Sequence, residues 1–213
     1  MRRPSPGLTP EGLPCLGLVT VICVCFALLG WGAATLAALA LLALAANFFH
    51  DPERVIPQEP GLAVSPADGR VSAVERAADP FTGETRTVVR IFMNVFNVHV
   101  NRAPVAGSVA AIRYHPGKFF NASFDKASQH NERCALSLTG EDGRTWTVVQ
   151  IAGLIARRIV CLADPGDSLA RGQRLGMIKF GSRLDVYLPE DYIAKVAVGE
   201  RVLAGQSVIA AAK

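Results

Sequence analysis

The residues best placed to do chemistry in this 213-residue chain are Gly181 and Ser182, which join two runs rich in apolar, β-branched and aromatic residues. Those runs, Met177 to Phe180 and Leu184 to Leu188, predict strands. A Gly-Ser pair between strands is usually an ordinary turn. A serine hydroxyl can also attack the carbonyl of the residue before it, if the backbone is strained and a base is near. The pair therefore predicts either a turn or a peptide bond that cuts itself.

A reacting serine needs a base, and His99 is the histidine whose setting suits that task. It lies in the alternating stretch of residues 96–101, which predicts a strand with His99 and two asparagines on one polar face. A single histidine is more often structural than catalytic. Asp68, in a Pro-Ala-Asp-Gly sequence, is the candidate to orient the imidazole, although these four residues also make an ordinary turn. Ser182, His99 and Asp68 form the candidate catalytic set.

Four further motifs precede Ile178-Lys179-Phe180-Gly181-Ser182-Arg183 along the chain. They are Ser65-Pro66-Ala67-Asp68-Gly69-Arg70-Val71, Asn97-Val98-His99-Val100-Asn101-Arg102-Ala103-Pro104, Lys118-Phe119-Phe120-Asn121-Ala122 and Asn131-Glu132-Arg133. Together they resemble the phosphatidylserine decarboxylases, in particular their short, membrane-anchored bacterial and archaeal form. The resemblance runs from about Asp51 to Pro189. Each motif is weak by itself, and it is their order that is specific.

This resemblance implies that Ser182 Oγ attacks the Gly181 carbonyl and that β-elimination then cuts the resulting ester. The dehydroalanine left behind would hydrolyse to ammonia and a pyruvoyl group, which is the implied cofactor. The mature enzyme would hold a large chain of residues 1–181 and a small chain of residues 182–213 that begins with the pyruvoyl group. The substrate amine would form a Schiff base with the pyruvoyl keto carbon. Phosphatidylserine in the membrane would lose CO₂ and become phosphatidylethanolamine.

The same resemblance gives roles to single residues and leaves one role open. His99 would act as the base, and Asp68 would orient and charge-balance its imidazole. Better-known, longer members of the family carry a second histidine three positions later, where this chain has Arg102. In those members the later histidine is linked to self-cleavage and the earlier one to decarboxylation. Either His99 serves both steps here, or Arg102 binds the carboxylate or phosphate of the substrate bidentately.

Residues 114–126 contain several aromatic side chains and predict a long loop. If this loop dips into the bilayer, Lys118 or Lys126 lies near the lipid phosphate and Asn121 contacts the substrate. The alternative is a surface loop whose phenylalanines cap the core.

Composition narrows the class of protein. Hydrophobic residues make up 50% of the chain, the mean hydropathy is +0.28, and the excess lies near the N-terminus. The net charge of +4 comes from interspersed charges without a basic run, so nucleic acid is not an expected partner. The five cysteines show no paired spacing, which argues against a disulfide framework and fits a reducing compartment.

Residues 13–46 are almost uninterrupted apolar sequence. One straight helix of this length would run ~50 Å, too long for a ~30 Å hydrocarbon core, and Gly30-Trp31-Gly32 interrupts it. We expect two short helices that form a hairpin inserted from the cytoplasmic face of the cell membrane. A signal peptide is the alternative, although the stretch is long for one and lacks an obvious processing site. The predicted organisation is a tail (1–12), this hairpin (13–46), a linker (47–60) and a decarboxylase domain (61–213).

Two internal echoes and several short strand patterns predict a mainly β domain of the α+β class. The pattern P-x-x-G-x-V-x-A-aliphatic occurs at residues 66–74 and again at residues 104–112. The pattern G-acidic-x-aliphatic-x-x-G-Q occurs at residues 166–173 and 199–206, and resembles the tight turns of biotinyl and lipoyl carriers. We expect a small barrel-sandwich-like domain after the membrane hairpin. Whether it forms a homo-oligomer stays open.

Two other functions fit parts of this pattern. A membrane-anchored biotinyl or lipoyl carrier needs a lysine at a hairpin tip, and Lys179 stands at the wrong spacing for it. A lysostaphin-type zinc endopeptidase needs an H-x-H pair, whereas the four histidines are scattered, so no metal site is expected. An amino-acid decarboxylase that uses pyridoxal phosphate would need a larger α/β scaffold and a phosphate cup.

Overall fold

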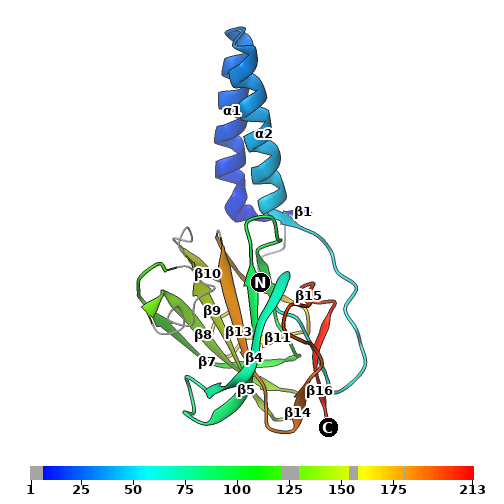
Figure 1. Cartoon of the computed structure of the whole chain (residues 1–213). Coiled ribbons are helices and arrows are strands. Elements are labelled where there is room, and N and C mark those ends of the chain that lie inside the picture. Colours follow the sequence, from blue (N-terminus) through cyan, green and yellow to red (C-terminus); the bar gives the residue numbers. More distant parts are fainter. Residues whose placement is uncertain (1–6, 121–129, 154–157, 180) are drawn as a thin grey trace. The chain divides into compact units, whose positions relative to one another are not determined.

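The computed structural model describes residues 7–120, 130–153, 158–179 and 181–213. It divides into two compact units, residues 1–53 and residues 54–213. The first unit contains β1 (Gly7–Leu8), a 3-10 helix (Pro10–Gly12), α1 (Leu13–Leu28), α2 (Gly32–Phe48) and β2 (His50–Asp51). β1 and β2 pair antiparallel at the base of the two helices (Figure 1).

The two helices of the first unit are apolar on all sides. The chain reverses at Gly30, whose φ of +72° is open to glycine without strain, and Phe26 stacks on Trp31 at 5.7 Å between ring centroids. Leu28 is 82% exposed and Leu36 is 69% exposed. The segment Pro10–Leu28 is long and apolar enough to cross a membrane, whereas α2 is shorter, at 17 residues. Such helices suit a lipid environment, and the topology of the hairpin stays a prediction.

The second unit is built from antiparallel sheets (Figure 1). Its strands are β3 (Leu62–Val64), β4 (Gly69–Ala78), β5 (Thr85–Met93), β6 (Val100–Arg102), β7 (Gly107–His115), β8 (Arg133–Gly140), β9 (Thr145–Ala152), β10 (Ile159–Cys161), β11 (Ser168–Leu169), β12 (Arg174–Ile178), β13 (Ser182–Tyr187), β14 (Tyr192–Ala194), β15 (Arg201–Val202) and β16 (Val208–Ala212). The largest sheet has eight strands in the order β11-β7-β8-β9-β13-β5-β4-β15. Two three-stranded sheets have the orders β10-β12-β6 and β14-β16-β3.

The strand order of the large sheet shows an internal duplication centred on β9 and β13. β4 and β7 each begin at the glycine of one Pro-x-x-Gly echo, and each shows a register irregularity at the same step, Val71/Ala73 in β4 and Val109/Ala111 in β7. β11 and β15 lie within the two Gly-Gln turns. One copy therefore consists of β11, β7, β8 and β9, and the other of β15, β4, β5 and β13. The repeated sequence patterns fall in the first two strands of each copy.

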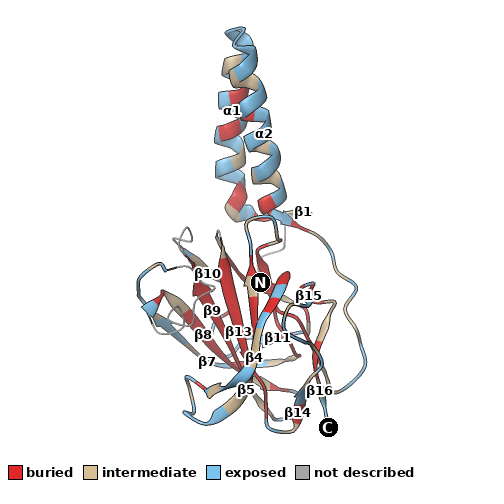
Figure 2. Ribbon diagram, in the orientation of Figure 1, coloured by how far each residue is buried: buried red, intermediate tan, exposed pale blue. Residues whose placement is uncertain are grey.

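The main core packs against one face of the large sheet and includes Ile91 and Leu136, both fully buried. The central strand β13 is buried along its whole length (Figure 2). Because side chains alternate along a strand, Leu184 and Val186 join the main core, whereas Tyr187 joins a smaller cluster. The first residue of β13 is therefore held in the interior of the domain.

The prediction of a mainly β domain is confirmed, and the structure corrects three of its details. The strand expected over residues 96–101 begins only at Val100, because the chain turns at residues 94–97, where the Asn97 N–H donates to the Asn94 oxygen at 3.1 Å. The runs on either side of Gly181-Ser182 lie in different sheets, because β12 ends at Ile178 in a three-stranded sheet and β13 begins at Ser182 in the large one. Ser182 is thus a strand residue and not part of a hairpin turn. Tyr114 and His115, which were expected in a loop, continue the pairing of β7 with β8.

Candidate active site

Ser182 begins the central strand and is paired on both sides. It lies opposite Met93 of β5 and opposite Ala152 of β9. The residue is fully buried, and among the described residues its Oγ has no hydrogen-bond partner. The preceding Gly181 has a φ of +56°, in the left-handed region that disfavours other residues. A buried hydroxyl without a partner is costly in a folded protein, so it calls for a functional explanation.

His99 lies one residue before β6 and is fully buried. Its Nδ1 is 2.7 Å from the backbone oxygen of Asn97. Because a carbonyl only accepts, Nδ1 carries the proton and Nε2 of the neutral ring is a proton acceptor. Burial lowers the pKa of His99 to about 4, against the opposing effect of the Asn97 hydrogen bond. The imidazole is therefore neutral at pH 7, as a general base must be.

A buried amide pair connects β6, which begins just after His99, to the strands around Ser182. Asn101, two residues after His99, directs its Nδ2 to the sulfur of Met93 at 3.8 Å, and Met93 lies opposite Ser182. The Nε2 of Gln150 in β9 donates to Asn101 Oδ1 at 2.8 Å. Sequence reasoning placed Asn101 on the face of His99 but missed Gln150, which lies within an apolar run that gives no polar signal.

Asp68 directly precedes the strand β4, at the same end of the strands of the large sheet as Ser182. Gly69 begins β4, and a Cβ there would stand 2.3 Å from the backbone oxygen of Phe92, next to Met93. The carboxylate of Asp68 accepts a hydrogen bond from Arg54 Nη2 at 2.8 Å and another from the backbone N–H of Ala204 at 2.7 Å. These contacts fix the carboxylate, and its expected effect on the His99 imidazole stays a prediction.

The four residues predicted to lie near the substrate differ in their settings. Arg102 is buried, with 4% of its surface exposed, and its Nη1 donates to the backbone oxygen of Gly172 at 3.0 Å. One donor of its guanidinium is therefore used inside the protein. Lys118 forms an isolated parallel bridge with Asn131. Asn121 and Lys126 lie outside the described residues, so the roles proposed for all of these residues stay predictions.

Asn131 supports the edge of the site from the β9 side. Its side chain is fully buried, donates to the backbone oxygen of Ala152 at 2.7 Å and exchanges hydrogen bonds with the backbone of Phe120. Ala152 lies opposite Ser182. The Asn-Glu-Arg motif thus contributes a backbone clamp, for which an asparagine amide has both the donor and the acceptor.

A buried ion pair lies on the other face of β13. Arg183 Nε donates to Asp185 Oδ1 at 2.8 Å, and Arg90 Nε is 3.6 Å from Asp185 Oδ2. Burial raises the pKa of Asp185 above its ordinary value, although both arginines oppose that effect. These charges hold the strand that Ser182 begins, and the sequence alone gave no reason to pair them.

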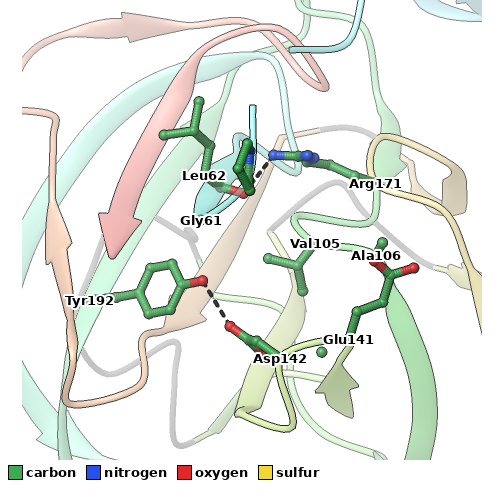
Figure 3. Close-up of a pocket in the computed structure, with 10 residues that line it drawn as sticks. Gly61, Leu62, Val105, Ala106, Glu141, Asp142, Arg171 and Tyr192 are labelled. Atoms are coloured by element: carbon green, nitrogen blue, oxygen red, sulfur yellow. Dashed lines mark hydrogen bonds between the residues drawn. The ribbon is translucent and has the colours of Figure 1, made fainter. Parts of the chain in front are cut away.

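A pocket lies at the turn between β8 and β9. It encloses about 320 Å³ and is lined by residues that include Leu62, Asp142, Arg171 and Tyr192 (Figure 3). Tyr192 donates its hydroxyl to Asp142 at 2.9 Å across this pocket. None of the predicted site residues lines it. In the described part of the chain, no three His, Cys, Asp or Glu side chains gather as metal ligands would.

A fully buried serine after a positive-φ glycine, in a domain that also holds a neutral buried histidine just before β6, fits an enzyme precursor that processes itself. Comparison with known proteins supports that class. The family model described as phosphatidylserine decarboxylase matches residues 41–210. The chain belongs to the phosphatidylserine decarboxylase family.

Individual relatives match over almost their whole length. The phosphatidylserine decarboxylase proenzyme of Nitratidesulfovibrio vulgaris is 60% identical over 99% of this chain and 97% of its own. The proenzyme of Oleidesulfovibrio alaskensis is 57% identical over 100% of this chain and 98% of its own. That of Ruegeria pomeroyi is 50% identical over 94% of this chain and 93% of its own.

Proposed function

We propose that this chain is the precursor of a pyruvoyl-dependent phosphatidylserine decarboxylase that cuts itself between Gly181 and Ser182. Family membership supports the activity. The observation that carries the cleavage site is the buried Ser182 hydroxyl, directly after a glycine with a φ of +56° and with no hydrogen-bond partner among the described residues. A hydroxyl in that setting has its own upstream carbonyl as its nearest electrophile.

Cleavage needs no reactant other than the chain itself and water. Ser182 Oγ adds to the Gly181 carbonyl carbon, and the peptide C–N bond breaks, so that an ester replaces the amide and the serine nitrogen becomes an amine. Loss of the serine α-proton then expels the Gly181 carboxylate and leaves dehydroalanine. Water converts its enamine carbon to a ketone and releases ammonia. The products are chains 1–181 and 182–213, the second one capped by a pyruvoyl group.

His99 is the base in this scheme. Its neutral imidazole, with Nδ1 tied to the Asn97 carbonyl, presents Nε2 as the acceptor for the hydroxyl proton. The strand that begins just after His99, β6, is joined to Met93, opposite Ser182, through Asn101. We assign Asp68 to the orientation of the imidazole and Arg102 to the substrate carboxylate or phosphate, with Lys118 and Asn121 near the headgroup.

The residues around Ser182 suit a pyruvoyl group, because the hydroxyl from which it derives is buried and unpartnered in the described residues. When formed, that group supplies a keto carbon that draws electrons from the amine-bearing substrate as CO₂ leaves. The buried pairings of β13 hold the new chain end, and the burial of the site limits access of water. The apolar helix pair would keep the enzyme at the cytoplasmic face of the membrane, where its lipid substrate lies.

The test is an assay of membranes that contain the expressed protein, with phosphatidylserine labelled in its carboxyl group. We expect release of labelled CO₂ that hydroxylamine abolishes, because hydroxylamine traps the ketone. Membranes with the Ser182→Ala protein should release none. Activity that survives carbonyl trapping would contradict a pyruvoyl enzyme. A fully cleaved protein that releases no labelled CO₂ would contradict phosphatidylserine as the substrate.

A further inference from the structure

The segment of residues 54–61, which we call the strap, runs from the end of the first unit to β3 and is fastened to the β domain at three points. The first fastening is Arg54. Its Nη2 donates to Asp68 Oδ2 at 2.8 Å, and its Nη1 donates to Gln206 Oε1 at 3.0 Å. The two charged side chains are 10% and 8% exposed, so this ion pair is nearly buried.

The second fastening is apolar and explains the two Gly-Gln turns that the sequence repeats. Ile56 packs between Gly172 and Gly205, which are the last glycines of the two turns. A Cβ at Gly172 would stand 2.4 Å from Ile56 Cδ1, and a Cβ at Gly205 would stand 2.8 Å from the same atom. Both glycines also have positive φ, 75° and 76°. The duplicated turns thus form a seat that only glycine leaves open for the strap.

The third fastening is Arg171, at the far end of the strap. Its Nη1 donates to the backbone oxygens of Glu59 and Leu62 at 2.8 and 2.9 Å, and its Nη2 donates to that of Gln58 at 3.3 Å (Figure 3 shows the bond to Leu62). Arg171 therefore holds backbone only. Of the two arginines that fasten the strap, Arg54 is the one that binds a residue of the proposed catalytic set.

We propose that Arg54 is a positioning residue for self-cleavage: it fixes the carboxylate of Asp68, so that the strap must be seated before the Gly181–Ser182 bond is cut. This inference rests on the proposed function, in which Asp68 takes part in cleavage. A carboxylate that is mostly withdrawn from water is held in one rotamer by a paired guanidinium, and removal of that partner leaves a buried charge. The strap thereby links the segment that follows the membrane helices to the timing of maturation.

The test compares rates of self-cleavage after synthesis of the full chain, followed by separation of the large and small chains. We expect Arg54→Ala to cleave at least roughly 10-fold more slowly, as loss of one partner of a nearly buried ion pair implies. Guanidinium at a concentration that leaves the protein folded should restore part of the rate by filling the vacated space, whereas sodium at the same ionic strength should not. Arg54→Lys should cleave at an intermediate rate.

Arg171→Ala is the matched control, because it releases the other end of the strap and leaves Asp68 paired. It should cleave within about 2-fold of the unmodified chain and gain nothing from guanidinium. Thermal melting of each variant in a Ser182→Ala background, where no chain is cut, checks that the precursor folds. Asp68→Asn should cleave slowly with or without guanidinium.

Two outcomes would overturn the inference. One is cleavage of Arg54→Ala at the unmodified rate. The other is equal slowing of Arg54→Ala and Arg171→Ala without rescue, which would make the strap a structural clamp. Failure of the proposed function would look different, because the unmodified chain would then stay whole.

Discussion

The two copies of the duplicated sheet motif end differently at equivalent points. In one copy, β8 and β9 are joined by a tight turn in which Gly140 N–H donates to Arg144 oxygen at 2.8 Å and Gly143 has a φ of +76°. In the other copy, β5 and β13 meet where Met93 lies opposite Ser182, and the whole of residues 94–181 intervenes between them. A positive-φ glycine precedes the second strand in both copies: Gly181 directly before β13, and Gly143 two residues before β9.

If Ser182 reacts as proposed, the positive-φ glycine before it is not sufficient for the reaction, because the other copy has one too. Arg144, which follows Gly143, has a side chain that is 40% exposed and forms ion pairs with Asp142 and Asp191 at the surface. Ser182, which follows Gly181, is fully buried. Separating β5 from β13 by a long stretch of chain allows His99 and Asn101 to enter near the strand end, where a two-strand hairpin would have closed it. In the proposed scheme, burial of Ser182 and the base role of His99 set this copy apart from the other.

The largest expected effect comes from exchanging the residue after each glycine. Ser182→Ala should abolish self-cleavage, because the methyl group of alanine has no nucleophile to attack the Gly181 carbonyl. Arg144→Ala should cleave within about 2-fold of the unmodified chain, since it removes only exposed ion pairs. Denaturing gels of both purified variants measure this. Cleavage of Ser182→Ala at the same bond would remove the serine from the scheme.

The next effect concerns the base. His99→Ala should slow self-cleavage by about 10²- to 10⁴-fold, the range that a positioned general base contributes. His130→Ala, which changes an exposed histidine, should cleave normally. The time course of chain separation measures both. If His99→Ala is cut at the normal rate and still releases CO₂ from phosphatidylserine, the assignment of the base is wrong.

Acid should destabilise the precursor through His99. Because burial lowers its folded pKa to about 4 from an ordinary value of 6.5, the unfolded chain binds the proton first as the pH falls. The contribution of the neutral ring to the free energy of unfolding is fully present above about pH 6.5. It is lost as the pH falls toward 4, by about 3 kcal/mol at most.

Urea unfolding of Ser182→Ala, with and without His99→Gln, measures this contribution between pH 7 and pH 4. The difference in acid sensitivity between the two proteins should match the histidine term. Equal pH dependence in both proteins would mean that His99 is solvated.

The smallest expected effects compare polar contacts at the two ends of β9. Gln150→Leu should lower the free energy of unfolding by about 2 kcal/mol, because Asn101 Oδ1 loses its donor in a fully buried setting. Tyr192→Phe, which removes the bond to Asp142 at the other turn, should cost about 1 kcal/mol because that contact is partly solvated. Chemical denaturation in the Ser182→Ala background measures both. A larger loss for Tyr192→Phe would reverse the proposed ranking of the two ends.

Much of the fold could be predicted because local sequence patterns determine its strands and turns. The strands around Val89, Leu136 and Val148 follow runs of β-branched and apolar residues, and the chain reversal between the helices falls at Gly30. The repeated turns were visible as sequence echoes. Their meaning was not, because the duplication appears only when the pairing order of the strands is known.

The site was harder to predict because its contacts join residues far apart in the chain. His99 and Ser182 stood out through a family resemblance, but the partner of Asp68 proved to be Arg54, in a stretch interpreted as a linker. Gln150 was hidden in an apolar strand, and its pairing with Asn101 depends on the packing of one sheet on another. Local patterns carry no information about such long-range hydrogen bonds.

The most direct test of the account is the intact mass of the purified protein. We predict two chains that end at Gly181 and begin at position 182, with the small chain lighter by one ammonia than a serine-initiated chain and lacking a free amino terminus. A single chain of 22.6 kDa with an unmodified serine at position 182 would contradict it.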